Sequence, residues 1–149
     1  MKIGKFAYPK NVRFKCSRCA LCCGDTENRD RTILLMKIEV NDIAEKTSMH
    51  LKEFAEKIEG CEPYIYRMKK TEKGKCVFLK DDSCAIYSVR PLICRFYPFQ
   101  LKSSENDKYS FMYTEECLGI GQGPKLKGRF FEKLFTHLTD QMERNLRAT

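Results

Sequence analysis

The sequence predicts a small α+β protein in which short strands, hairpins and short helices surround a group of cysteines, followed by a long C-terminal amphipathic helix. Apolar runs are short and often alternate with polar residues, and turn residues separate them at close intervals, as in short strands. Helical spacing of apolar residues continues for many turns only near the end of the chain. Because 149 residues have the length of one domain, we expect residues 1–149 to form a single domain.

The N-terminal part is expected to hold two strands, one on each side of a cysteine-rich loop. Alternation over residues 12–15 predicts a short strand that leads directly into Cys16. Residues 16–24 then form the loop, and Gly24 permits an exit turn that other residues would resist. The apolar run within residues 31–38 predicts a second, partly buried strand.

Two short helices are expected next. A polar cap at residues 41–42 predicts a helix that ends near Lys46. Ser48 is placed to cap a second helix over residues 51–58, where the apolar residues follow helical spacing. His50 between them is expected to be a surface or capping residue rather than a metal ligand.

A hairpin is expected in the middle of the chain. Alternation over residues 64–70 and 75–80 predicts two strands, joined by a turn at residues 71–74. A second turn at residues 81–83 then presents Cys84. This region therefore delivers cysteines from a strand and from a turn.

A helix bounded by prolines and a second hairpin are expected after a briefly extended segment at residues 86–87. Pro91 is well placed in the first turn of a short helix, and Pro98 must end or limit that helix. Residues 100–102 and 109–113 are expected to form the second hairpin across a polar tip.

The chain is expected to end in a helix that follows Pro124 and continues to about Arg147. One face carries the apolar residues Leu126, Phe130, Leu134, Leu138, Met142 and Leu146, and the opposite face is basic. Packing of such a face on the core is commoner than binding to a membrane. The glycines within residues 119–123 predict a flexible approach that directs backbone amides toward the sulfur of Cys117.

Four cysteines lie within eight residues, in the spacing C-x2-C-x2-C-C: Cys16, Cys19, Cys22 and Cys23. Thiolates are soft ligands that suit zinc, copper(I) or iron–sulfur clusters, and the x2 spacing lets one turn direct two sulfurs to one centre. Neighbouring side chains diverge from the backbone. The adjacent pair Cys22 and Cys23 is therefore expected to serve two metals or different irons of a cluster.

Four further cysteines complete a set of eight candidate metal ligands: Cys76, Cys84, Cys94 and Cys117. Eight thiolates make two sets of four, the usual complement of a tetrahedral zinc site or a cubane cluster. Cys61 lies apart from the others in a turn-like context and is expected to be a spare. The alternative is a disulfide framework, which belongs to oxidising compartments.

Compartment and charge bear on the choice between these interpretations. The N-terminal segment lacks the apolar region of a signal peptide, and no apolar run reaches the length of a membrane span, so we expect a cytoplasmic protein. The net charge of +8 suggests an acidic partner such as nucleic acid. Eight bound thiolates and two divalent centres would lower that charge to about +4, which weakens the nucleic-acid argument.

Several motifs together resemble a known family. They are Cys16-x2-Cys19-x2-Cys22-Cys23, Cys76-Val-Phe-Leu, Cys84-Ala-Ile-Tyr, Arg90-Pro-x2-Cys94-Arg95-x-Tyr97-Pro98-Phe99 and Cys117-x-Gly119-x-Gly121-x-Gly123. This series is similar to that of the CxxCxxCC zinc- or iron-chelating domains, the YkgJ-type cysteine cluster proteins. The matching motifs extend from about Phe14 to Gly123 and cover most of the chain. The resemblance implies metal binding and specifies no activity.

Within the matched motifs, Arg90 and Arg95 flank Cys94 and are candidate cofactor-binding residues, because a guanidinium can donate charge-assisted hydrogen bonds to thiolate or sulfide. The equal alternative for Arg90 is that it ties loops together by donating to backbone carbonyls. Nearby aromatic side chains are expected to shield the metal site from water.

Three functions remain open from the sequence. Three close cysteines with a distant fourth are typical of ferredoxin-like ligation. This spacing favours an iron–sulfur protein, for which a [4Fe–4S] cluster is the candidate cofactor. Such a protein would act in electron transfer or cluster handling with a redox or assembly partner protein. The second function is a binding module stabilised by two four-cysteine zinc sites.

The third function is a methyltransferase-related enzyme or accessory protein. A related cysteine cluster occurs in flagellin lysine N-methylases, which the resemblance connects with an iron–sulfur cluster and methyl transfer. The sequence shows no convincing S-adenosylmethionine site and no Ser/His/Asp grouping that can be placed. It therefore leaves enzyme activity open.

Overall fold

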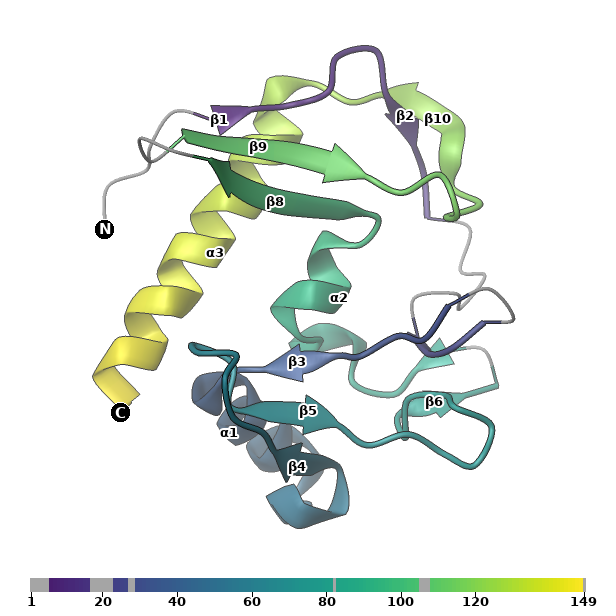
Figure 1. Cartoon of the computed structure of the whole chain (residues 1–149). Helices are drawn as coiled ribbons and strands as arrows, with labels where there is room; N and C mark the ends of the chain where they lie inside the picture. The colour runs from purple at the N-terminus through teal and green to yellow at the C-terminus, as the bar shows by residue number, and fades with distance from the viewer. Residues whose placement is uncertain (1–5, 17–22, 27–28, 82, 105–107, 149) are drawn as a thin grey trace. The chain divides into compact units, whose positions relative to one another are not determined.

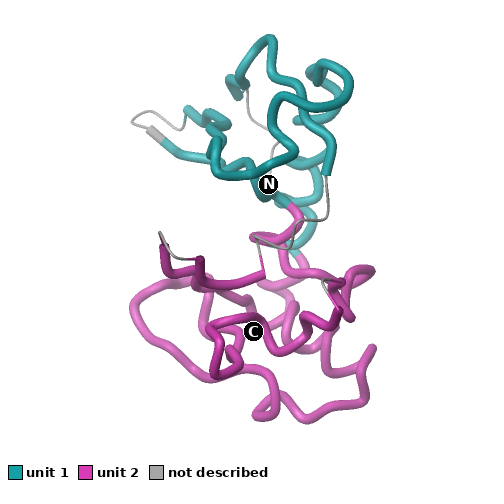
Figure 2. The backbone as a smooth tube through the Cα atoms, turned by 90° about the vertical axis from the view of Figure 1, so that its right-hand side faces the viewer, with its two compact units in different colours: residues 1–19, 96–143 teal, residues 20–95, 144–149 magenta. Residues whose placement is uncertain are grey.

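The computed structural model describes residues 6–16, 23–26, 29–81, 83–104 and 108–148. It contains mixed helices and short strands in several small sheets, which confirms the predicted α+β class and the long C-terminal helix. The chain divides into two compact units (Figure 2). Unit 1 comprises residues 1–19 and 96–143, and unit 2 comprises residues 20–95 and 144–149. A single domain over residues 1–149 stays a prediction.

Unit 1 is built on a three-stranded sheet with the strand order β1-β9-β8 (Figure 1). The strands are β1 (Phe6–Ala7), β8 (Phe99–Ser104) and β9 (Lys108–Tyr113). β1 runs parallel to β9, whereas β8 and β9 form an antiparallel hairpin. The predicted second hairpin is therefore confirmed. It extends to the pair Phe99 and Tyr113, whose ring centroids are 6.3 Å apart.

A second, two-stranded sheet in unit 1 pairs β2 (Arg13–Phe14) with β10 (Ile120–Lys125). The strand predicted to lead into Cys16 is confirmed. The glycine run, however, belongs to a strand rather than to the flexible segment predicted. Gly119 must be glycine because a Cβ there would collide with the backbone carbonyl of Lys15. Close backbone approach, and not flexibility, explains this glycine.

Helix α3 extends from Gly128 to Ala148 and carries the apolar face that unit 1 buries. It begins later than the predicted start after Pro124, because β10 continues to Lys125. Phe131 and Phe135 are fully buried, as an amphipathic helix requires. The prediction fails at Leu146, which is 73% exposed, because the neighbouring polar residue Asn145 is buried in its place.

The core of unit 1 consists mainly of aromatic rings. The Phe131 ring lies 5.2 Å from Phe99, 5.1 Å from Phe111 and 5.0 Å from Tyr8, measured between centroids. Phe6 of β1 stacks on Phe135 at 5.1 Å. Such rings bury large areas and favour offset or edge-to-face packing. The sheet and α3 of unit 1 are thus joined by carbon contacts that need no metal.

Unit 2 contains a second three-stranded sheet, with the order β3-β5-β4. The strands are β3 (Leu34–Leu35), β4 (Ala55–Lys57) and β5 (Tyr66–Met68), and both pairings are antiparallel. The predicted strand over residues 31–38 is therefore shorter than expected. The predicted helix over residues 51–58 is wrong: a 3-10 turn, η2 (Leu51–Glu53), precedes β4. Pairing of β4 with β5 overrides the helical spacing there.

Helix α1 covers Lys37–Thr47 and begins before the predicted cap at residues 41–42. The carboxylate of Glu39 turns back and accepts a hydrogen bond from the backbone N–H of Met36 at 2.9 Å. His50 caps the η2 turn, since its Nδ1 accepts from the N–H of Lys52 at 3.2 Å. The interpretation of His50 as a capping residue is therefore confirmed, and Ser48 does not cap that turn.

The predicted hairpin between residues 64–70 and 75–80 forms only in part. Its turn is present, with the N–H of Thr71 donating to the carbonyl of Lys75 at 2.7 Å. Beyond the turn the two segments share a single bridge, Lys70 with Cys76, because β5 pairs with β3 and β4 instead. The later residues form a separate small hairpin of β6 (Leu79–Lys80) and β7 (Ser83–Cys84).

The segment after β7 contains the 3-10 turn η3 (Tyr87–Val89) and helix α2 (Leu92–Phe96). The prediction of an extended segment at residues 86–87 is wrong, because Ile86 is the N-terminal flank of η3. The short helix after Pro91 is confirmed, and it ends before Pro98 as expected. Every helix in the described part of the chain is too short or too polar to span a lipid bilayer.

Candidate metal centre

Thiols form part of the hydrophobic core of unit 2. Cys76 is 6% exposed and belongs to the buried cluster that also contains Phe54, Phe78 and Ile86. Three further predicted ligands are partly buried and pack against the same cluster: Cys23, Cys84 and Cys94. Four of the eight predicted ligands therefore surround one small core, although they come from four separate segments of the chain.

Backbone pairing places Cys23 beside Cys76. The N–H of Cys76 donates to the carbonyl of Cys23 at 2.6 Å, and Gly24 forms a bridge with Lys75. A Cβ on Gly24 would lie 2.5 Å from the carbonyl oxygen of Gly74, so only glycine permits this approach. The glycine predicted to shape the exit of the loop thus also joins that loop to the next cysteine segment.

The small β6–β7 hairpin holds Cys84 near the same segment. Cys84 pairs with Leu79, whose N–H donates to the carbonyl of Cys76 at 3.0 Å. The N–H of Phe78 points at the sulfur of Cys76, with an N···S distance of 3.5 Å. Donors directed at a ligand sulfur stabilise the thiolate and tune a bound metal. The backbone around Cys76 is therefore suited to an anionic sulfur.

Cys94 lies in helix α2, whose start is anchored by a buried acid of α1. Glu39 is 3% exposed, and its carboxylate accepts from the N–H of Leu92 at 2.5 Å as well as from Met36. Burial raises the pKa of Glu39, although both backbone hydrogen bonds oppose that shift. Sequence reasoning missed this role; an acid in the first turn of a helix is the signal that indicates it.

Two other predicted ligands belong to unit 1. Cys16 is exposed directly after β2, and Cys117 is buried shortly before β10. The N–H of Lys15 donates to the carbonyl of Gly119 at 3.1 Å, which joins the two cysteine-bearing segments. The predictions for Cys19 and Cys22 fall on residues outside the described part of the chain.

Within the described residues, no group of three or more Cys, His, Asp or Glu side chains is arranged to hold a metal ion. No disulfide joins any two of the cysteines in that part of the chain. Cys61 is exposed in a turn closed by the N–H of Tyr64, which donates to its carbonyl at 2.9 Å. Assignment of the eight cysteines as ligands, and of Cys61 as a spare, stays a prediction.

The two candidate arginines differ in their surroundings. The guanidinium of Arg90 lies over the ring of Tyr87, 3.9 Å from its centroid. The Nε of Arg95 is buried and has no hydrogen-bond partner among the described residues. Burial, and then the charge of Arg90, lowers the pKa of Arg95. A buried donor that lacks an acceptor, on the residue that follows Cys94 in α2, is suited to an anionic group.

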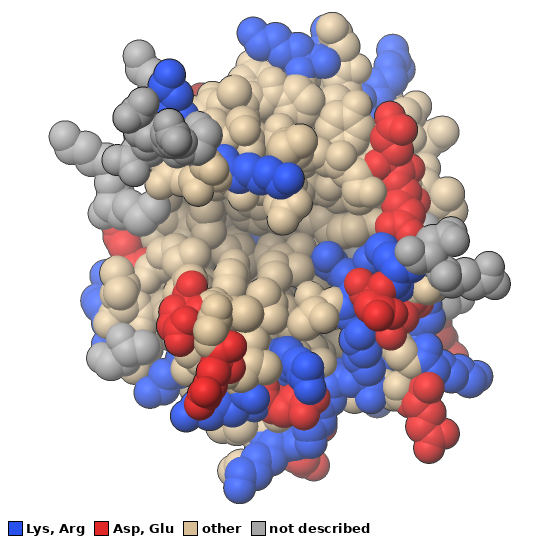
Figure 3. All heavy atoms as spheres, viewed as in Figure 1, with Lys and Arg blue, Asp and Glu red and all other residues tan. Residues whose placement is uncertain are grey.

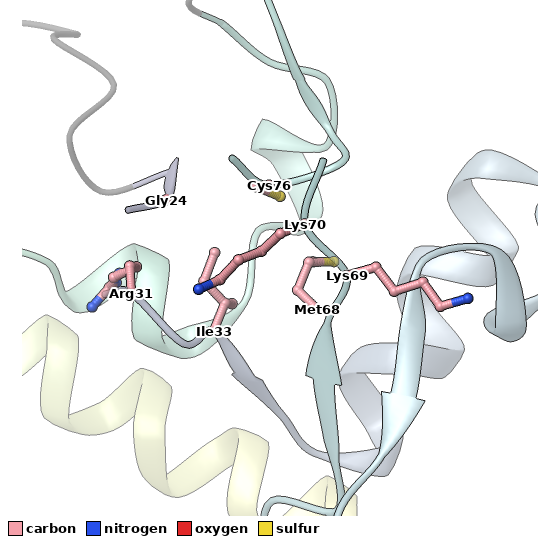
Figure 4. Close-up of a pocket in the computed structure, with 7 residues that line it drawn as sticks. All are labelled: Gly24, Arg31, Ile33, Met68, Lys69, Lys70 and Cys76. Carbon is pink, nitrogen blue, oxygen red and sulfur yellow. The ribbon is translucent and has the colours of Figure 1, made fainter. Parts of the chain in front are cut away.

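A shallow hollow lies beside Cys76 (Figure 4). Its rim includes Arg31 and Lys70, while the side chain of Lys69 extends away from it. The Nζ of Lys70 lies 2.6 Å from the carboxylate of Asp25, which also accepts from the N–H of Arg31 at 2.6 Å. These contacts, led by that of Lys70, lower the pKa of Asp25. The hollow is thus bounded by a fixed ion pair.

Comparison with known proteins identifies the family. Residues 15–118 match the model of the CxxCxxCC family, described as a putative zinc- or iron-chelating domain. Two relatives from Methanocaldococcus jannaschii carry the names Uncharacterized protein MJ0661 and Uncharacterized protein MJ0939. The first is 28% identical over 142 residues, covering 88% of this chain and 71% of the relative.

The second relative is 30% identical over 120 residues, covering 76% of this chain and 39% of its own length. No solved structure matches the chain. The family match includes all eight predicted ligands and spans most of the sequence. This chain therefore belongs to the CxxCxxCC family of zinc- or iron-chelating domains.

Proposed function

We propose that the protein binds iron–sulfur through its cysteines and serves in electron transfer or cluster handling. The observation that carries the proposal is the buried Nε of Arg95, which lacks an acceptor among the described residues and belongs to the residue that follows Cys94 in α2. Four thiolates around a divalent metal core have a net charge of about −2. Such a group would supply both the acceptor and the negative charge that this arginine needs.

Iron–sulfur is favoured over zinc because its inorganic sulfides are additional hydrogen-bond acceptors, beyond the thiolates themselves. The cysteines that would hold the metal are Cys16, Cys19, Cys22, Cys23, Cys76, Cys84, Cys94 and Cys117. Among the described residues of unit 2, Cys76 belongs to an apolar core with buried Phe78 and Ile86, and Cys23, Cys84 and Cys94 pack against it, which keeps water from one side of them. When bound, an iron–sulfur cluster would supply one-electron redox chemistry.

The first experiment is purification without oxygen, followed by a visible spectrum and measurement of iron, zinc and sulfide per chain. A brown protein with iron and sulfide in comparable amounts is the expected result. Serine at any of the eight ligand positions should reduce its colour and iron, whereas Cys61→Ser should leave both unchanged. A colourless protein with about two zinc ions per chain would contradict the proposal and favour the zinc-stabilised module.

The role of Arg95 has its own test. Arg95→Gln removes a positive charge beside Cys94 and should lower the reduction potential of the cluster, because a nearby cation stabilises the more negative, reduced state. Arg95→Lys keeps the charge and should retain most of the potential. Equal potentials in all three proteins, measured by a redox titration of the visible spectrum, would remove Arg95 from the cofactor-binding set.

A further inference from the structure

Unit 1 carries a basic surface around β2 and β10, which we name the basic ribbon. It consists of residues 8–16 and 117–131, which contain six Lys and Arg residues and no Asp or Glu. All six are exposed: Lys10, Arg13, Lys15, Lys125, Lys127 and Arg129. Figure 3 shows Lys and Arg side chains projecting along the upper edge of the face in view, with acidic side chains below them on the right.

The pairing of the two strands brings like charges together. Arg13 lies directly opposite Lys125 in the antiparallel register, so both side chains emerge on the same face of the sheet. Phe14, the next residue, turns toward the core, where its ring lies 5.6 Å from that of Phe99. Like charges on opposed residues are unfavourable in a free sheet. The pairing of Arg13 with Lys125 is therefore not expected to stabilise unit 1.

Nothing in the described part of unit 1 neutralises this surface. None of the six basic side chains forms an ion pair among the described residues. The guanidinium of Arg13 donates only to a backbone carbonyl, that of Gly123, at 3.3 Å. The nearest acids in sequence, Glu116 and Glu132, directly flank the second segment of the ribbon, and none of the ion pairs among the described residues joins either of them to its six basic side chains. An anionic partner is the missing counter-charge.

The ribbon also contains the two candidate metal ligands that the structure describes in unit 1. Cys16 ends its first segment and Cys117 begins its second, and the Lys15–Gly119 hydrogen bond joins the two segments. Leu118, next to Cys117, is 63% exposed. An exposed apolar side chain among charged residues is the pattern of a small protein–protein contact with an apolar centre and a charged rim.

The aromatic side chains of the ribbon argue against nucleic acid as the partner. Single-stranded nucleic acids bind by stacking their bases on exposed rings beside basic residues. Here Tyr8 stacks on Phe131 at 5.0 Å, and Phe130 lies 5.6 Å from Phe99, so both rings are engaged in the core of unit 1. The ribbon thus offers charges and one exposed leucine, but no stacking platform.

We propose that the basic ribbon is the docking surface for an acidic redox-partner protein, with Leu118 at the centre of the contact. The electron-transfer part of this inference rests on the proposed function, because it places the partner beside Cys16 and Cys117. Complementary charge increases the rate of encounter and orients the two proteins, and it makes both effects sensitive to salt.

The test uses an acidic plant-type [2Fe–2S] ferredoxin as the probe. The ribbon variant is Arg13→Glu/Lys15→Glu/Lys125→Glu. The matched control is Lys57→Glu/Lys73→Glu/Lys80→Glu, which changes the net charge equally at three exposed lysines of unit 2. Binding to the oxidised probe and reduction by the reduced probe are both measured as salt is raised. Should the ribbon variant fail to fold, the same positions changed to Gln replace it.

We expect the unaltered protein to bind the probe, and we expect the affinity to fall as salt rises. The ribbon variant should lose at least about tenfold in affinity and in electron-transfer rate, while the control stays within about threefold. Equal losses in both variants, or no binding by the unaltered protein, would overturn the proposal. Tighter binding to a 20-nucleotide single-stranded DNA than to the probe, at about 150 mM salt, would overturn it in favour of nucleic acid.

The binding measurement separates this inference from the proposed function. Binding is measured on protein with and without iron. The six basic side chains of the ribbon belong to unit 1 and carry their charge whether or not iron is bound. If the protein carries no cluster, electron transfer fails in every variant while binding still reports on the ribbon. If the cluster is present and the ribbon variant binds normally, only the docking inference fails.

Discussion

The two units of this protein place their cysteines in different relations to their cores. In unit 1, the core consists of phenylalanine and tyrosine rings, and Phe131 alone contacts four other rings. In unit 2, the core contains a thiol, Cys76, and three more cysteines pack against it. The described residues of unit 2 form no long hairpin, since their strands contain only two or three residues each.

This difference indicates which part of the chain depends on metal. Aromatic packing supplies stability to unit 1 whether or not a metal is present. Unit 2 places potential thiolates against its own core, so metal binding and folding are expected to be coupled there. Unit 1 thus exposes Cys16 and buries Cys117, whereas four cysteines of unit 2 lie in or against one buried cluster.

The largest expected effect is the loss of a core thiol in unit 2. Cys76→Ser should lower the metal content and unfold unit 2, because it removes a predicted ligand and introduces a hydroxyl at a buried position. Cys61→Ser is the matched control, since Cys61 is exposed. Metal analysis and circular dichroism check both variants. A Cys76→Ser protein with full metal content would remove Cys76 from the ligand set.

The second prediction concerns the aromatic core of unit 1. Phe131→Ala deletes a fully buried ring and should lower the free energy of unfolding by about 3–5 kcal/mol. It should do so without reducing the metal bound per folded chain, because its neighbours Phe99 and Phe111 are not metal ligands. Urea unfolding and metal analysis of the folded fraction measure the two effects. If the folded Phe131→Ala protein lost metal in proportion to its loss of stability, metal binding would depend on unit 1 as well as on unit 2.

A smaller effect is expected at Glu39 in unit 2. The two carboxylate oxygens of Glu39 accept from the N–H groups of Met36 and Leu92. In Glu39→Gln, one of these N–H groups faces the NH2 group of the amide, which cannot accept a hydrogen bond. The loss should be about 1–3 kcal/mol at neutral pH. The pKa of Glu39 is raised in the folded chain. At pH values above the ordinary pKa of a glutamate, the folded chain therefore keeps a proton that the unfolded chain has lost. The free energy of unfolding therefore declines through that window.

In Glu39→Gln this contribution to the pH dependence is absent. We therefore expect a flatter dependence of unfolding free energy on pH in the variant than in the unaltered chain, from the ordinary pKa of a glutamate upward. Urea unfolding at a series of pH values provides the comparison. A decline of equal slope in both proteins would show that Glu39 is not the group responsible.

The smallest expected effect concerns the end of α3. The side-chain oxygen of Asn145 accepts from the N–H of Ile38 at 3.1 Å, in the first turn of α1. Asn145→Ala removes this cap and should cost about 1 kcal/mol. Leu146→Ala is the control, because Leu146 is exposed, and it should change stability by less than about 0.5 kcal/mol. Thermal unfolding that ranks the two variants in the opposite order would contradict the contact.

The features predictable from the sequence were local ones. Pro91 and Pro98 bound α2, because proline constrains the backbone wherever it occurs. The β8–β9 hairpin followed from alternation on both sides of a polar tip. The cysteine motifs identified the family because their spacing is read directly from the chain.

The features that escaped prediction depend on distant partners. Residues 51–58 follow helical spacing, yet β4 forms there because β5 pairs with it. The glycines after Cys117 looked like a flexible segment, but β2 supplies a strand partner. Glu39 caps its own helix and also anchors α2, a role that requires the fold to be known. The ligand assignment of the eight cysteines remains a hypothesis, since the described residues form no closed metal site.

Hydrogen exchange of the metal-bound and metal-stripped protein, read segment by segment by mass spectrometry, tests the central claim most directly. We predict that chelation under reducing conditions removes protection from the segments around Cys76, Cys84 and Cys94. The β8–β9 hairpin and Phe131 segment of α3 should keep theirs. Unchanged protection around these three cysteines, or equal loss in both units, would contradict the view that only unit 2 folds around its thiols.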